Sequence, residues 1–170
     1  MPSAVKTSHA TVLVAFRDMI AALPEFTEET VWISDDPPAS GEEIPNASRH
    51  KLWLCIYPLE GSPDGLKFIG GGENSLVEHT GATTIIYSVD RLSRKGQPVH
   101  ALTRSDVGLL GVKRTLLIAL HGQNLDDGSG GSLLTQPIEC VHAERPRVNG
   151  QPFGDLALTW SLPFHWDLTP

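Results

Sequence analysis

The clearest hydrophobic pattern in the chain is an alternation of apolar and polar positions near its carboxyl end. Apolar side chains occupy every second position over residues 156–166, namely Leu156, Leu158, Trp160, Leu162, Phe164 and Trp166. Successive side chains of a strand point to opposite faces, so the pattern predicts one long strand with a single apolar face. The "NG" pair at residues 149–150 is typical of a type I′ turn, and residues 137–148 supply a partner strand. We therefore expect a β-hairpin over residues 137–167.

Pro163 interrupts this alternation and has no N–H to donate to a neighbouring strand. We expect this end of the strand to lie at a sheet edge or beyond the sheet. An extended edge usually needs a cover, which a second subunit would provide.

Two segments carry apolar residues at helical spacing. Residues 8–23 predict a helix that Ser8 caps and Pro24 stops, with an inner face of Val12, Phe16, Met19, Ile20 and Leu23. Residues 103–122 predict a second helix, whose inner face is traced by Leu109, Val112, Leu116 and Leu120. Thr103 and Asp106 have the spacing of a capping box, and Gly122 is placed for a left-handed C-terminal cap.

The second predicted helix has more apolar surface than one stripe requires. Leu110 and Leu117 lie outside its inner face. We expect such a helix to be covered by its own sheet on one side and by a neighbour on another.

Shorter apolar runs predict the other strands. Residues 51–57 predict a strand that is covered on both faces and ends at Pro58, residues 82–89 predict another, and residues 31–33 predict a short one. The Pro-rich residues 34–50 predict a long surface loop, and residues 58–74 predict a mobile excursion whose glycines include Gly70, Gly71 and Gly72. This element order favours a single α+β domain over residues 1–170, with two main helices on one face of a largely antiparallel sheet and long loops.

Charge and cysteine content narrow the class of protein. A net charge of −7 and a pI near 5.4 argue against a general binder of nucleic-acid backbones, which clusters Lys and Arg. Cys55 and Cys140 lie in apolar runs without a CxxC partner, so we expect reduced, buried thiols, while the sequence alone leaves a disulfide open. No apolar run approaches the roughly 20 residues that span a bilayer, and the amino terminus has no apolar signal core. We expect neither membrane insertion nor secretion by a signal peptide.

The segment "HGQNLDDGSGGSLLTQP", residues 121–137, is the strongest candidate for a ligand site. A calcium loop that starts at Asn124 fails where Gly128 and Thr135 replace oxygen ligands, and a phosphate cradle fails because the glycines follow a helix and precede a strand. The histidines are dispersed, and a triad of Ser129, His121 and Asp126 lacks a GxSxG elbow. We therefore expect no catalytic, metal or cofactor site here, and an acidic mobile tip over residues 124–132.

The order of these features resembles the tail terminator (tail completion) proteins of tailed bacteriophages. The matching segments are "AALPEF", "KLWLCIYP", "GATTIIYSVD", "DVGLLGVKRTLLIALHGQNL", "TQPIECV" and "LALTWSLPFHWDL". The resemblance implies a structural protein without enzymatic activity or cofactor that forms a homohexameric ring on the tail tube. Such a ring stops tube polymerisation and presents a surface to the head-completion or neck protein. The implied location is the tail–neck junction of the virion, and the host cytoplasm during assembly.

Six copies carrying −7 each would form an acidic collar that lets viral DNA pass without specific binding. We take Asp126, Asp127, Gly128, Ser129, Gly70, Gly71 and Gly72 as candidate contacts with subunits or the tube. The runner-up is another head–tail joining protein, such as a stopper or a tube-like protein. The alternative from a different class is a cytosolic enzyme or ligand-binding domain whose site forms only in three dimensions.

Overall fold

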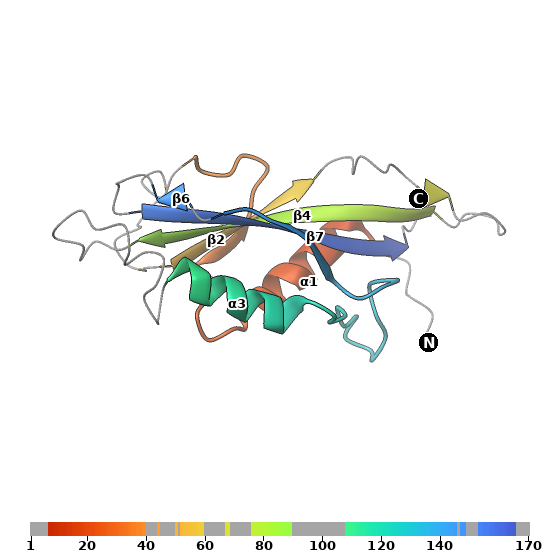
Figure 1. Ribbon diagram of the computed structural model, residues 1–170. Coiled ribbons are helices and arrows are strands. Elements are labelled where there is room, and N and C mark those ends of the chain that lie inside the picture. The colour runs from red at the N-terminus through yellow and green to blue at the C-terminus, as the bar shows by residue number, and fades with distance from the viewer. Residues whose placement is uncertain are drawn as a thin grey trace, which may run out of the picture.

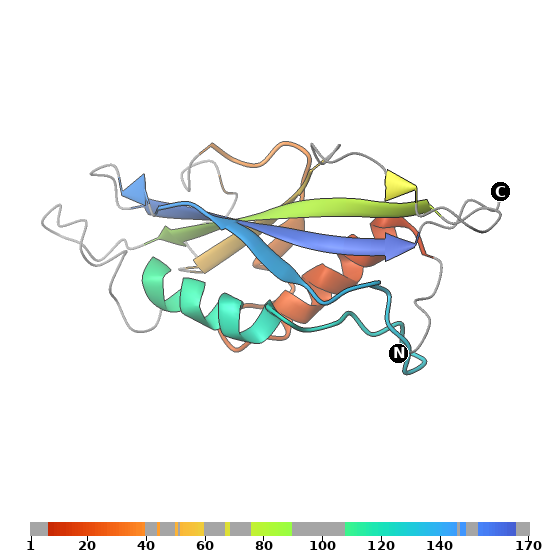
Figure 2. The same ribbon diagram turned by 45° about the vertical axis from the view of Figure 1, so that its right-hand side comes forward.

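The computed structural model describes residues 7–39, 44, 50, 52–59, 67–68, 76–89, 108–145, 147–148 and 153–165. These residues form two helices and one sheet, and both helices lie on the same face of the sheet (Figures 1 and 2). The elements in chain order are α1 (His9–Ala21), β1 (Val31–Ile33), β2 (Leu52–Leu59), β3 (Lys67–Phe68), β4 (Leu76–Val89), α3 (Leu109–Leu120), β5 (Glu139–Ala143), β6 (Arg147–Val148) and β7 (Phe153–His165). The predicted α+β class, with two helices on one face of the sheet, is confirmed.

The sheet is built around two long strands, β4 and β7. Its strand order is β1-β2-β4-β7-β5, with β3 added to β4 and β6 added to β7. The β4–β7 ladder runs from Val77↔His165 to Val89↔Phe153. Among the strands that the structure describes, β1 and β2 pair in parallel and the other pairs are antiparallel. The presence of β3 corrects the expectation of an irregular excursion over residues 58–74, because Lys67 and Phe68 pair with Val77 and Leu76. The glycines of that excursion lie outside the described residues.

The helix α1 begins and ends as its sequence predicts. The Ser8 hydroxyl accepts a hydrogen bond from the Thr11 amide at 3.2 Å, which satisfies one of the amides that a helix start leaves unpaired. The helix ends at Ala21, three residues before Pro24. Its buried side chains are Val12, Leu13, Phe16 and Ile20.

The helix α3 begins later than the sequence predicts. Gly108 is its N-cap and makes no side-chain cap, and the expected capping box of Thr103 and Asp106 lies outside the described residues. Leu109, Val112, Leu116 and Leu120 are buried as predicted. Gly122 has a φ of 81°, which confirms the left-handed cap, and its amide donates to the Ile138 carbonyl at 2.8 Å.

Two prolines lie inside strands without breaking a ladder. The predicted end of the strand at Pro58 is wrong, because β2 continues to Leu59. The Leu54 amide donates to the Thr30 carbonyl, and the Ile56 carbonyl accepts from the Ser34 amide, so alternate residues of β2 turn their backbone groups toward β1. Pro58 follows the same alternation, and its nitrogen faces the side of β1, which ends opposite Ile56. The carbonyl of Pro163 accepts from the Thr135 amide at 2.8 Å, on the side of β7 where β5 has already ended at Ser161. The predicted edge position of Pro163 is therefore correct locally, although β7 is an inner strand.

The predicted hairpin over residues 137–167 exists, but its turn differs. Val148 pairs with Gly154, whereas a two-residue turn at residues 149–150 would pair Val148 with Gln151. The first arm is also divided into β5 and β6, with a bulge between Cys140 and His142. The register leaves five residues between the paired positions, which excludes a two-residue loop, and Asn149 and Gly150 themselves lie outside the described residues.

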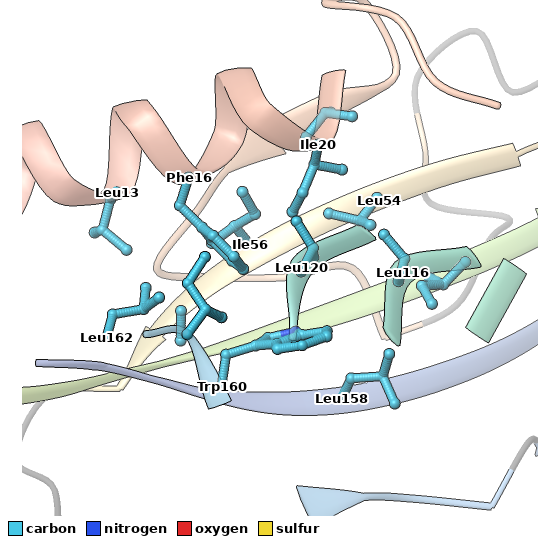
Figure 3. Close-up of a cluster of buried hydrophobic side chains, with 14 of the residues drawn as sticks. Leu13, Phe16, Ile20, Leu54, Ile56, Leu116, Leu120, Leu158, Trp160 and Leu162 are labelled. Atoms are coloured by element: carbon cyan, nitrogen blue, oxygen red, sulfur yellow. The ribbon is translucent and has the colours of Figure 1, made fainter. Parts of the chain in front are cut away.

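The main core lies between the sheet and the two helices (Figure 3). Trp160 is fully buried at its centre, opposite Ala82 on β4. Its indole contacts the Phe16 ring edge-on at a centroid distance of 6.1 Å, and its Nε1–H donates to the Thr84 hydroxyl at 2.9 Å. Burial of this polar hydroxyl is compensated further by its donation to the Leu158 carbonyl at 3.3 Å.

A second, smaller cluster covers part of the opposite face of the sheet. It contains Ile44, Trp53, Cys55 and Tyr87, with Trp32 and Ile85 packed beside them. The Tyr87 hydroxyl donates to the Pro38 carbonyl at 2.5 Å, so residues from the Pro-rich segment cover this face. The prediction that the strand at residues 51–57 is covered on both faces is confirmed.

The two cysteines are free and cannot pair within the chain. Cys55 lies on β2 and Cys140 on β5, with β4 and β7 between them. Three strand spacings separate the two positions by about 14 Å, whereas a disulfide requires Cα atoms closer than about 7 Å. The sheet order therefore answers what the sequence left open.

Candidate functional site

Asp126, Asp127, Gly128 and Ser129 lie at the tip of a closed loop that follows α3. The base of the loop is tied by two hydrogen bonds of 2.8 Å, from Gly122 to the Ile138 carbonyl and from Ile138 to the Gln123 carbonyl. Nearer the tip, Leu133 donates to the Leu125 carbonyl at 2.8 Å, and Asp126 forms an isolated bridge with Ser132. The loop is anchored in the main core by the buried side chains of Leu125, Leu133, Leu134 and Ile138.

The Asp127 carboxylate organises the tip itself. Its Oδ1 accepts hydrogen bonds from the Ser129 amide at 2.8 Å, the Ser129 hydroxyl at 2.8 Å and the Gly131 amide at 2.9 Å. These donors, the Ser129 amide first, lower the pKa of the Asp127 carboxyl below its ordinary value. Gly128 and Gly130 have φ values of 81° and 86°, which glycine adopts without strain. The tip thus has a hydrogen-bonded conformation, and the expected mobility of residues 124–132 stays a prediction.

An open groove of about 510 Å³ lies between this tip and the outer face of α1. We call it the α1 groove. The helix contributes Ala10, Thr11, Val14, Ala15 and Asp18, and the loop contributes Asp126, Asp127, Gly128 and Leu133. In both ribbon views the loop runs beside α1 toward one end of the sheet (Figures 1 and 2).

The α1 groove combines an apolar floor with acidic edges. Val14 is 42% exposed although it is a large apolar side chain. The Asp18 carboxylate accepts hydrogen bonds from the Arg17 guanidinium, whereas within the described part of the chain Asp126 and Asp127 accept only from amides and a hydroxyl. Such a groove suits a partner that presents an apolar side chain beside a cationic one.

The other residues considered for catalysis or metal binding make hydrogen bonds of a different kind. His121 Nδ1 accepts a hydrogen bond from the Cys140 amide at 3.3 Å, and the Ser129 hydroxyl donates to Asp127. Ser129, His121 and Asp126 are therefore not hydrogen-bonded to one another as a catalytic triad would be. Among the residues that the structure describes, no three His, Cys, Asp or Glu side chains are placed to hold a metal ion. Gly70, Gly71 and Gly72 lie outside the described residues.

The outer face of α1 is the part of the site that the sequence interpretation missed. The signal was present, because Val14 falls on the polar side of a helix whose inner face is traced by Val12, Phe16 and Ile20. A lone exposed valine is common on helices, and Val14 indicates a binding surface only because the adjacent loop forms a groove with it.

No family model matches this sequence, and no curated protein matches it. None of the described helices is long and apolar enough to cross a membrane.

Replacing Asp127 with Ala is expected to disorder the tip while leaving the core intact, because three donors lose their shared acceptor. Hydrogen exchange should show faster exchange of the Ser129 and Gly131 amides. Asp126→Ala is the matched control, since it removes only the 2.8 Å bond from Gly128. Unchanged exchange in Asp127→Ala would contradict the role of this carboxylate.

The same carboxylate predicts how the tip depends on pH. The folded-state pKa of Asp127 lies below the value of 3.8 for the unfolded chain. The stabilisation of the tip by the ionised carboxylate is therefore fully present above pH 3.8 and is lost as the pH falls through the folded-state pKa. Exchange of the Gly131 amide, corrected for intrinsic rates, should therefore accelerate only below about pH 3.8.

Proposed function

We propose that this protein is a structural ring protein of the tail–neck junction of a tailed bacteriophage. In this role the ring sits on the last ring of the tail tube, stops tube growth and joins the tail to the head-completion or neck protein. The proposal rests on the resemblance in element order and on the surfaces that the fold leaves exposed.

The observation that carries the proposal is a pair of unlike surfaces on the helical side of the sheet. One is the α1 groove, which is acidic at its edges. The other is the outer face of α3, where Leu110 and Ile118 are 49% and 68% exposed. A closed ring requires two different surfaces on each subunit, because each copy contacts one neighbour through each surface.

The arrangement of these surfaces also suits a ring. Helix α3 lies toward one end of the long strands, and the loop that borders the α1 groove lies toward the other end (Figures 1 and 2). When the two surfaces lie at opposite ends of a subunit, each copy can bind one neighbour at each end.

Tube capping tests the proposed function directly. Tail tube protein from the same genome should polymerise to shorter tubes when this protein is added, and negative-stain images should show a ring of about six copies at one tube end. Tube protein alone is the control for length. Unchanged tube length with no bound ring would contradict the proposal, whereas a ring that binds only neck proteins would favour a stopper.

A further inference from the structure

The outer face of α3 carries a line of exposed side chains, which we call the α3 ridge. It consists of Leu110, Arg114 and Ile118, spaced four residues apart and therefore aligned along one side of the helix. This side is opposite the buried positions Leu116 and Leu120. The α3 ridge thus presents one cationic side chain between two apolar ones.

The α3 ridge and the α1 groove are complementary in chemistry. Val14, Asp126 and Asp127 are among the residues that line the groove, while the ridge offers Ile118 and Arg114. An Arg guanidinium pairs with carboxylates through directed, charge-assisted hydrogen bonds, and apolar contact between Ile and Val removes both from water.

We propose that the α3 ridge of one copy binds the α1 groove of a second copy, with Ile118 on Val14 and Arg114 beside Asp126 and Asp127. This inference rests on the proposed ring function and names the contact that would join its subunits. Helix α3 and the groove-bordering loop lie toward opposite ends of the molecule, so a copy bound through its ridge keeps its own groove for the next copy (Figures 1 and 2).

A second copy is the occupant that the local charges of the two surfaces favour, because Arg114 on the ridge is opposite in sign to Asp126 and Asp127 at the groove. The chain as a whole is acidic, at −7, so two copies repel each other at long range. Association then needs a local contact of opposite sign, and Arg114 against Asp126 and Asp127 supplies one. The apolar neighbours on both surfaces exclude water from this pair, which strengthens it.

Complementation between two blocked variants tests the contact. Val14→Glu places a charge on the groove floor, and Ile118→Glu places one on the ridge, and both side chains are exposed enough for the fold to remain. Each variant alone should associate at least tenfold more weakly than the wild type in light scattering and sedimentation. An equimolar mixture should form a dimer and nothing larger, because one intact ridge then meets one intact groove.

Val141→Glu is the matched control, since Val141 is 54% exposed and lies on β5, outside both surfaces. It should associate like the wild type. The contact is overturned if Val14→Glu and Ile118→Glu assemble normally, if the mixture stays monomeric, if Val141→Glu is equally impaired, or if the wild type itself stays monomeric.

The stoichiometry of the wild type separates this contact from the proposed function. A wild-type ring, with weaker association of Val14→Glu and Ile118→Glu, supports both proposals. An open chain of wild-type copies, with weaker association of both variants, supports the contact and contradicts the ring, whereas a closed wild-type dimer overturns the contact. A ring that both variants still form supports the ring and overturns the contact.

Discussion

Trp160→Ala is expected to lower the free energy of unfolding by about 3–5 kcal/mol, since it removes a fully buried aromatic side chain from a core that cannot close around the gap. The indole contacts Phe16 from α1 and donates to Thr84 on β4, so its loss loosens the contact between helix and sheet. Urea unfolding followed by circular dichroism would measure the change. A loss this large is a substantial part of the stability of a typical domain.

Trp160→Phe is the matched control for this prediction. It keeps an aromatic ring and removes the donor to Thr84, whose hydroxyl still bonds to the Leu158 carbonyl. We expect a smaller loss of about 1–2 kcal/mol. Equal stability of Trp160→Ala and the wild type would show that this side of β7 does not face the core.

The second large effect concerns the reactivity of the two thiols. Burial raises the pKa of the Cys55 thiol from 9.0 to about 12, which lowers its thiolate fraction at pH 8 about a thousandfold. Burial also raises the pKa of Cys140, but this residue is only half-buried. A thiol reagent at pH 8 should therefore label Cys140 first in the folded protein, and both cysteines rapidly in denaturant.

Single substitutions assign the two phases. Cys140→Ser should leave one slow thiol, and Cys55→Ala should leave one faster thiol. Because the folded-state pKa of Cys55 is raised, this thiol favours the folded state below pH 9, and the contribution is lost as pH rises from 9 toward 12. Two equally fast thiols in the native protein would contradict the buried position of Cys55.

Periodicity predicted the elements that have one clear apolar face. Of the residues that the spacing selects, α1 buries Val12, Phe16 and Ile20, and β7 buries Leu156, Leu158, Trp160, Leu162 and Phe164, because a side chain's face follows directly from its position in the period. Met19 and Leu23 are only partly buried, and Trp166 lies outside the described residues. The α+β class followed from the order of these elements. The parallel pairing of β1 with β2 did not, since three residues carry no information about their partner.

The errors arose where tertiary contacts replaced local rules. Pro58 stays in β2 because its nitrogen faces the side of β1, which ends opposite Ile56. The ladder register places Val148 opposite Gly154, which excludes a two-residue loop at residues 149–150. The hydrogen bonds of the tip were missed for a similar reason. They join Asp127 to Ser129 and Gly131, a pattern that resembles a flexible acidic linker in sequence.

The position of β7 in the sheet affects how the protein folds during its synthesis. Of the strands that the structure describes, β7 is the last to leave the ribosome, yet it lies between β4 and β5 and carries Trp160 into the centre of the core. A nascent chain without it exposes an unpaired edge of β4 and the apolar faces of both helices. The complete sheet therefore cannot form before β7 has been synthesised, and chains that lack β7 are ready substrates for chaperones and proteases.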